Sequence, residues 1–289
     1  MKKSAPVLVL VVIALVGISV AVGRGLWTAP SDSVSQRKPE AVAAAAAATA
    51  RASSPADGAG GAAIAAIEKA ATAKKYLFIF FWKTDSEQTA AMKKVFEDGV
   101  KKAGNRAQSV HVCLTDPGEK GIVDKFGLDR APMPLALAIA PNGAVMGGFP
   151  SKFTEQDLLG AFGTPCTERC MKLLQDGKLV FLCVQNAATE SNGDAMKGVR
   201  EFKADERFTA ATEIVTLDPT DSAETPFLTD LKIDPKTTEA VTVFLAPPGA
   251  PIAEFKGATD KTELVATLEK AGSACAGGKC GPGGCGPQK

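Results

Sequence analysis

The sequence predicts an α/β fold made of two consecutive units, each a mixed central sheet flanked by helices. One observation is the continuous apolar run Tyr76–Trp82, whose length and aromatic content fit a buried central strand. Another is that such strands alternate with amphipathic stretches of helical spacing. The third is that one element order, helix-strand-helix-strand-helix-strand-strand-helix, occurs twice, over residues 62–163 and 164–272. The repeat predicts two domains of one topology.

In the first unit, apolar spacing and end signals predict each element. A short helix is expected from residue 62 to near Lys75, and Ser86 is placed to cap the helix that follows the central strand. Alternation over Val110–Leu114 predicts a second strand. The remaining expected elements are a helix around residues 122–126, a strand over 134–140, a Pro141-Asn142-Gly143 turn with its partner strand over 144–149, and a last helix opened by Thr154 and Asp157 that runs through Phe162.

The second unit repeats this order. Its first helix is expected to open at Thr164-Pro165 and to end at Gly177, because proline suits the first helical position and glycine the end. The other expected elements are strands over residues 179–184, 214–217, 241–245 and 252–255, helices around 196–202 and 227–231, and a final helix capped by Asp260 and Glu263.

The N-terminal segment, residues 1–26, indicates export. Lys2 and Lys3 form a basic start, and residues 6–23 are almost wholly apolar and uncharged. Cleavage near Ala21-Val22-Gly23 would make it a signal peptide, whereas retention would make it a single transmembrane helix that anchors the chain in the membrane. Either way the positive end stays in the cytoplasm, and the rest is expected to be periplasmic or otherwise extracytoplasmic. Residues 27–61 are rich in alanine and proline and are expected to be a disordered tether.

Composition excludes some classes of function. Lys+Arg number 33 and Asp+Glu 32, for a net charge of +1, so no basic surplus indicates nucleic-acid binding. His111 is the only histidine in the sequence, which excludes a multi-histidine metal site within one chain.

Two stretches of the first unit carry a family resemblance. Lys74-Lys75-Tyr76-Leu77-Phe78-Ile79-Phe80-Phe81 is similar to the lysine-led apolar strand before the active site of thioredoxins. Met133-Pro134, placed before a strand and the Pro141-Asn142-Gly143 turn, is similar to that family's cis-proline. The chain thus resembles the thioredoxin-like superfamily, as two thioredoxin-like domains in tandem. The resemblance implies a cis Met133–Pro134 bond and a groove for an extended peptide or protein partner, lined by Met133, Pro134, Asp85 and Gln88.

The family's catalytic dithiol is missing from this sequence. Oxidoreductases of the family carry C-x-x-C after the central strand, where the helix start activates the first thiol. Here the loop reads Lys83-Thr84-Asp85-Ser86-Glu87-Gln88, with Asp85 and Gln88 at the cysteine positions. The second unit has Gln185–Ser191 there, and its later strand begins at Ala240-Val241 without the proline. We therefore expect no catalytic residues, no cofactor and no dithiol exchange at this site; Asp85 and Glu87 would instead stabilise the helix start.

Four of the seven cysteines fall within expected elements. Cys113 and Cys183 fall in strands and are interpreted as small buried apolar residues. Cys166 and Cys170 are four apart on one helix, so their side chains share a face. They are either part of an apolar face or a bonded or metal-ligating pair, and the helix start would favour a thiolate at Cys166.

The tail, residues 273–289, places Cys275, Cys280 and Cys285 in a Gly/Pro-rich segment expected to be unstructured. Flexible thiols suit Cu(I) or Zn(II), or disulfides within or between chains. Three functions follow for the whole chain. The favoured one is a non-catalytic protein-binding or scaffold module. The alternatives are a thiol redox protein that uses Cys166, Cys170 and the tail, and a soft-metal-binding protein that uses the tail alone.

Overall fold

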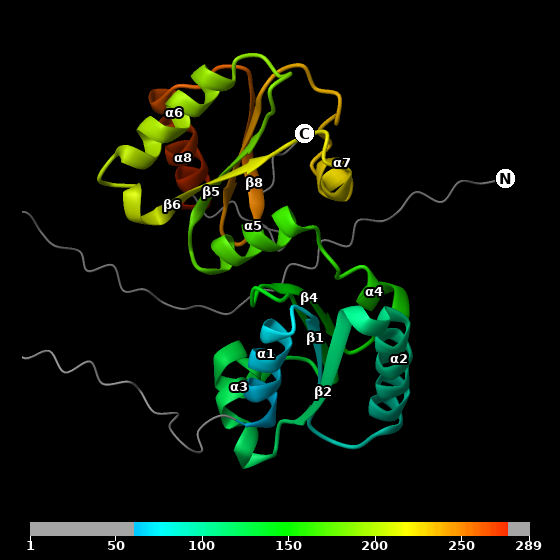
Figure 1. Ribbon diagram of the computed structural model, residues 1–289. Helices are drawn as coiled ribbons and strands as arrows, with labels where there is room; N and C mark the ends of the chain where they lie inside the picture. Colours follow the sequence, from blue (N-terminus) through cyan, green and yellow to red (C-terminus); the bar gives the residue numbers. More distant parts are fainter. Residues whose placement is uncertain (1–60, 277–289) are drawn as a thin grey trace, which may run out of the picture.

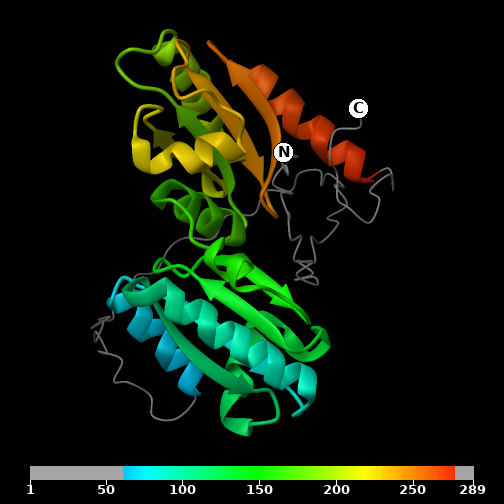
Figure 2. The same cartoon turned by 90° about the vertical axis from the view of Figure 1, so that its right-hand side faces the viewer.

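The computed structural model describes residues 61–276, with side chains as far as residue 272. The chain forms two four-stranded sheets that share no strand, in the orders β2-β1-β3-β4 and β6-β5-β7-β8. We call the unit built on β1–β4 domain 1 and the unit built on β5–β8 domain 2. Figure 1 shows each sheet with helices on both faces, and Figure 2 shows the same two units from the side.

Domain 1 is built around β1, which is parallel to β2 and antiparallel to β3. Its strands are β1 (Tyr76–Trp82), β2 (Ala107–Cys113), β3 (Leu135–Ile139) and β4 (Val145–Pro150), and its helices are α1 (Ala62–Thr72), α2 (Glu87–Ala103), α3 (Lys120–Phe126) and α4 (Glu155–Leu159). Successive side chains of a strand point to opposite faces. Leu77, Ile79 and Phe81 therefore pack under α1 and α3, whereas Phe78 and Phe80 pack under α2 and α4.

Domain 2 repeats this plan around β5. Its strands are β5 (Leu179–Val184), β6 (Thr212–Leu217), β7 (Val241–Ala246) and β8 (Ala250–Lys256), and its helices are α5 (Pro165–Gln175), α6 (Asn192–Ala204), α7 (Thr225–Asp230) and α8 (Lys261–Ala276). Short 3-10 turns η1 (Gly104–Arg106), η2 (Pro117–Glu119) and η3 (Leu128–Arg130) lie in domain 1, and η4 (Thr209–Ala211) and η5 (Ser222–Glu224) in domain 2. One face of the sheet packs on α5 and α7, and the other on α6 and α8.

The expected helix caps are confirmed. Ser86 Oγ accepts the Thr89 amide at 3.1 Å, and Thr154 and Asp157 form a reciprocal capping box at the start of α4. Asp260 accepts the Glu263 amide at 2.9 Å. These bonds satisfy amides at helix starts that have no partner within the helix.

Several element ends differ from those expected. The last helix of domain 1 ends at Leu159, with Gly160 at its C-cap, instead of running through Phe162, whose partly buried ring packs against Tyr76. β2 covers Ala107–Cys113, so its pairing with β1 begins earlier than the alternation indicated. α8 continues to Ala276, so the backbone of Cys275 is helical, which contradicts an unstructured tail from residue 273.

The structure describes no helix in residues 61–276 that is long and apolar enough to cross a membrane. The apolar segment 6–23, on which the export prediction rests, lies outside the described residues. Export therefore stays a prediction from the sequence.

Candidate functional site

The loop between β1 and α2 is held against the start of the helix. Buried Thr89 donates its hydroxyl to the Thr84 carbonyl at 3.0 Å, and its amide bonds Ser86. Asp85, between them, is exposed. In place of two thiols, this site presents a fixed polar turn.

Met133 and Pro134 lead into β3, and the bond between them is cis, as predicted. Pro134 is buried and Met133 half-buried. Ser151, at the end of β4, donates its amide to the Pro134 carbonyl at 2.7 Å. Gln88 donates from Nε2 to the Ser151 carbonyl at 3.0 Å, so a side chain at a cysteine position links α2 to the proline. The structure thus brings Gln88 to Pro134 through Ser151, whereas it gives Asp85 no hydrogen bond to this segment among the described residues.

The segment before β3, residues 131–133, has backbone groups without a hydrogen-bond partner among the described residues. The Ala131 amide bonds the Leu128 carbonyl at 3.1 Å, and Pro132 has no amide hydrogen. Within residues 61–276, no hydrogen bond engages the amide or the carbonyl of Met133. An unpaired backbone group next to a strand is a place where another extended chain can pair.

The sheet registers identify the corresponding segment of domain 2. Leu135 pairs with Phe81 and Pro150, and Val241 pairs with Val184 and Lys256. Counting back one and two residues, Ala240 occupies the place of Pro134, and Glu239 that of Met133. The bond from the Gly257 amide to the Ala240 carbonyl, 2.8 Å, repeats the one from Ser151 to Pro134. Domain 2 therefore lacks the proline at this place, as expected. Its cis proline, Pro247-Pro248, lies in the β7–β8 turn and was not predicted from the sequence.

In domain 2 this segment is paired by the protein itself. The Glu190 amide donates to the Thr238 carbonyl at 2.8 Å, and the Ala240 amide donates to the Glu190 carbonyl at 3.0 Å, which makes a parallel bridge between Glu190 and Glu239. The loop that reaches across is residues 185–191, longer than residues 83–86 of domain 1. Sequence reasoning missed this closure, although the longer loop was its signal.

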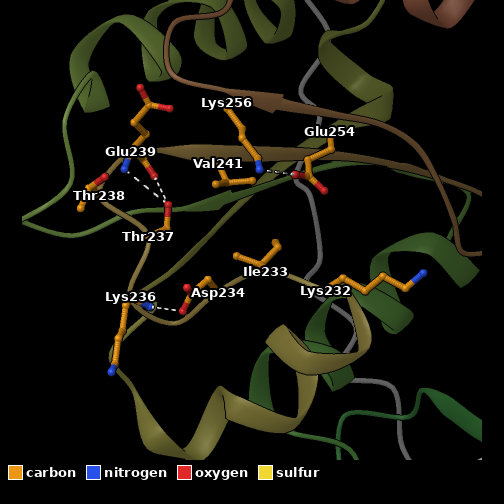
Figure 3. Close-up of a pocket in the computed structure, with 10 residues that line it drawn as sticks. All are labelled: Lys232, Ile233, Asp234, Lys236, Thr237, Thr238, Glu239, Val241, Glu254 and Lys256. Carbon is orange, nitrogen blue, oxygen red and sulfur yellow. Dashed lines mark hydrogen bonds and ion pairs between the residues drawn. The ribbon is translucent and has the colours of Figure 1, made fainter.

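A shallow cleft of about 360 Å³ lies beside the closed segment of domain 2. Figure 3 shows its lining, which comes from β8, from the first residue of β7 and from the chain between α7 and β7. Charges of both signs are mixed there, and several lining groups bond one another: Asp234 accepts the Lys236 amide at 2.9 Å, and Lys256 lies 3.8 Å from Glu254. The cleft therefore has no excess of one sign of charge by which it would select a charged ligand.

Cys166 and Cys170 lie in the core of domain 2 as free thiols. Their exposed fractions are 8% and 2%, and they pack with Leu174 under the sheet. The start of α5 was expected to favour a thiolate at Cys166, but the surroundings of this residue oppose one. Its pKa is raised by the neighbouring Cys170 thiol, by burial, and by the carboxylate of Glu224, which accepts the Cys166 amide at 2.9 Å. That carboxylate opposes the helix dipole at the place where the dipole would favour a negative sulfur.

Cys183 is buried as predicted, and burial raises its pKa to about 11. Cys113 differs from the prediction, because it is half-buried at the end of β2, with its Sγ 3.1 Å from Thr115 Oγ1. Its strand neighbour is Trp82, the last residue before the loop at 83–86, so this thiol lies at the end of the sheet from which that loop extends.

No cluster of three metal-ligating side chains occurs in the part of the chain that the structure describes. The thiols of Cys275, Cys280 and Cys285 lie outside the described side chains. Copper or zinc binding by the tail therefore stays a prediction from the sequence.

Comparisons with known proteins give structural likeness alone. No protein-family model matches the chain, and no curated protein matches it either. Among solved structures, the first two thioredoxin domains of Saccharomyces cerevisiae Eps1p align with 71% of this chain and 95% of that chain, at 9% identity and a TM-score of 0.27.

Two further structures align over a similar length. The zinc-bound form of human ERp44 covers 75% of this chain and 58% of that one, at 12% identity and a TM-score of 0.31. The N-terminal domain of alkyl hydroperoxide reductase subunit AhpF from Enterococcus faecalis covers 71% of this chain and 98% of that one, at 14% identity and a TM-score of 0.27.

The fold itself follows from the chain's own topology. The strand order β2-β1-β3-β4, with β1 parallel to β2 and antiparallel to β3, recurs as β6-β5-β7-β8. The corresponding helices of the two domains cover corresponding faces of the sheets. A cis proline precedes β3 in the first of these units. The chain has the thioredoxin-like fold, twice in tandem.

Proposed function

We propose that this is an exported, non-catalytic binding protein whose domain 1 takes an extended peptide segment of a partner protein at Met133. The observation that carries the proposal is the difference between the two domains at this place. The Met133 backbone has no hydrogen-bond partner among residues 61–276, whereas the corresponding segment of domain 2 is paired with its own loop.

The chemistry of the site supports binding more than catalysis. The loop at residues 83–88 contains no cysteine, so no mixed disulfide forms there. Gln88, in the place of the second cysteine, is engaged with Ser151. A partner chain that lies antiparallel to the segment would pair its backbone with Met133 and place its side chains near the exposed Asp85 loop.

A peptide selection tests the proposal directly. A library of random linear peptides displayed on phage is selected against the folded protein, and the bound peptides are mapped by amide chemical shifts in the 15N-labelled protein. We expect the largest shifts at Met133, Leu135 and Gln88. Selected peptides that shift Glu190 and Thr238 instead, or a library that yields no binder, would overturn the proposal.

A redox assay tests the non-catalytic part. We expect no insulin reduction above the uncatalysed rate, because Asp85 and Gln88 cannot carry the dithiol. The double variant Asp85→Cys, Gln88→Cys restores a C-x-x-C beside Pro134 and is expected to gain weak activity. Turnover by the unmodified protein comparable with that of a thioredoxin would contradict the proposal.

A further inference from the structure

We propose that the contact between Tyr76 of domain 1 and Glu168 of domain 2 is a latch that makes the two domains one rigid, cooperatively unfolding body. Tandem domains joined by an exposed linker are expected to move relative to each other. In this chain the linker is residues 160–164, between α4 and α5. Domain 1 contacts both this linker and α5, the first helix of domain 2.

The latch is centred on the first residue of β1. Tyr76 is 6% exposed, and its hydroxyl donates to Glu168 Oε1 at 2.5 Å while it accepts the Gly163 amide at 2.9 Å. The hydroxyl thus bonds the linker and α5 together. Burial and the Glu168 carboxylate raise the pKa of Tyr76, so the phenol keeps its proton and remains the donor.

The linker residues around Gly163 are packed. The centroids of the Phe162 and Tyr76 rings lie 4.6 Å apart, and the Arg106 guanidinium lies 4.0 Å from the centroid of the Phe162 ring. A Cβ at Gly163 would lie 2.5 Å from Cε of Met146 in β4, so this flexible side chain is packed directly against the linker. Thr164 caps α5 and bonds the buried carboxylate of Glu224.

A second set of contacts joins α5 to the β3–β4 hairpin of domain 1. Asn142, in the turn, donates from Nδ2 to the Glu168 carbonyl at 2.8 Å. Gln175 accepts the Val145 amide at 2.8 Å and donates to the Val145 carbonyl at 2.7 Å. Met171 packs against the apolar cluster of domain 1. Both ends of α5 are therefore tied to domain 1, while its other face belongs to the core of domain 2.

Domain 2 provides an internal reference for this role. β5 begins with Leu179 where β1 begins with Tyr76, as the pairing with the first residues of β6 and β2 shows. Leucine at this place completes a strand but offers no hydroxyl. The tyrosine is thus not needed for the start of a strand in this fold, which fits a role at the junction.

Amide hydrogen exchange distinguishes a latch from a local hydrogen bond. The reporter is the Val145 amide, which bonds Gln175 across the junction away from the substituted residues. In Tyr76→Phe and in Glu168→Ala we expect Val145 exchange to accelerate at least about tenfold, because the domains separate transiently. Leu77, within β1, is expected to keep its rate and serves as the control for the folding of domain 1.

A conservative variant and a double variant complete the test. Glu168→Gln keeps an oxygen acceptor for the phenol, so Val145 exchange should stay within about twofold of the original protein. Tyr76→Phe combined with Glu168→Ala should accelerate exchange no more than Tyr76→Phe alone, because the phenylalanine already removes the bond to Glu168 together with the one to Gly163. Unchanged Val145 exchange in both single variants, or fully additive effects, would overturn the proposal, as would two separate calorimetric transitions in the unmodified protein.

Discussion

Domains 1 and 2 share one fold but differ in the backbone pairing of one segment, the one before β3 in domain 1 and before β7 in domain 2. In domain 1 the loop after the central strand is short, a proline precedes β3, and the Met133 backbone is unpaired among the described residues. In domain 2 the loop is longer, alanine replaces the proline, and Glu190 pairs with the segment before β7. Among the described residues, this segment is thus left unpaired in domain 1 and paired by the longer loop in domain 2, while the strand order of the sheet stays the same.

The thiols should show the largest difference between the domains. At pH 8 a thiol with the raised pKa of Cys183, about 11, is only about one thousandth ionised, and its side chain is 1% exposed. We expect Cys113 to react with a maleimide at least about a hundredfold faster than Cys183, Cys166 or Cys170, with the modified sites located by peptide mass spectrometry. Equal protection of all four in the folded protein would show that the edge of domain 1 is as closed as the core of domain 2.

The next largest difference should come from two buried glutamates, Glu119 and Glu224, which bond the starts of α1 and α5. Their contributions to the free energy of unfolding should differ. Among residues 61–276, Glu119 accepts one hydrogen bond, from the Ala63 amide at 3.2 Å, whereas Glu224 accepts both the Thr164 hydroxyl and the Cys166 amide. We expect Glu224→Ala to lower the free energy of unfolding by about 2–3 kcal/mol and Glu119→Ala by about 1–2 kcal/mol, because each leaves buried donors unpaired. Urea unfolding measures both; an equal loss would mean that the second bond contributes nothing.

Placing the loop of domain 2 in domain 1 should give domain 1 the backbone pairing that domain 2 has before β7. Gln185 holds the place of Trp82 in the pairing register, so the graft starts one residue later. Replacing residues 83–86 with residues 186–191 is expected to let the grafted loop pair with Met133 and to weaken binding of a selected peptide at least about tenfold. Isothermal calorimetry gives the affinity, and a graft of the same length made of glycine and serine is the control. If the glycine-serine loop weakens binding equally, length alone obstructs the site and backbone pairing is not the cause.

His111 should give domain 1 a small acid sensitivity that domain 2 lacks. Burial and Lys93 lower its pKa, outweighing Glu97, whose Oε1 is 3.6 Å from Nε2. The unfolded state then binds the proton more tightly, so stability is full above the unfolded value of about 6.5 and falls as the pH drops below it.

Replacing this histidine with an apolar ring tests the effect. His111→Phe should remove a loss of less than about 1 kcal/mol between pH 7 and 5, measured by urea unfolding at each pH. Thr216 holds the same place in β6 and does not titrate, so Thr216→Val is the matched control. An unchanged pH slope in His111→Phe would assign the sensitivity to other groups.

Local rules were sufficient for most elements. The caps at Ser86, Thr154 and Asp260 were predicted correctly, because a cap depends on residues three positions apart. The apolar strand at residues 76–82 was predicted from its own composition, whereas the cis bond before Pro134 was implied by the family resemblance. Of the candidate site, Gln88 is linked to Pro134 through Ser151, whereas the burial of Cys166 beside Glu224 involves a contact that no local pattern contains.

By itself, the sequence determined the two-fold repeat, the alternation of strands and helices and the absence of a C-x-x-C in both loops, since each depends on residue types at short spacing. Tertiary structure alone decided which edge is open, because the pairing of Glu190 with Glu239 joins residues far apart in the chain. It also decided the thiol chemistry, since the Cys170 thiol, burial and Glu224, which reaches the start of α5 from a distant turn, together raise the pKa of Cys166. Burial and long-range contacts set both outcomes, and a local pattern contains neither.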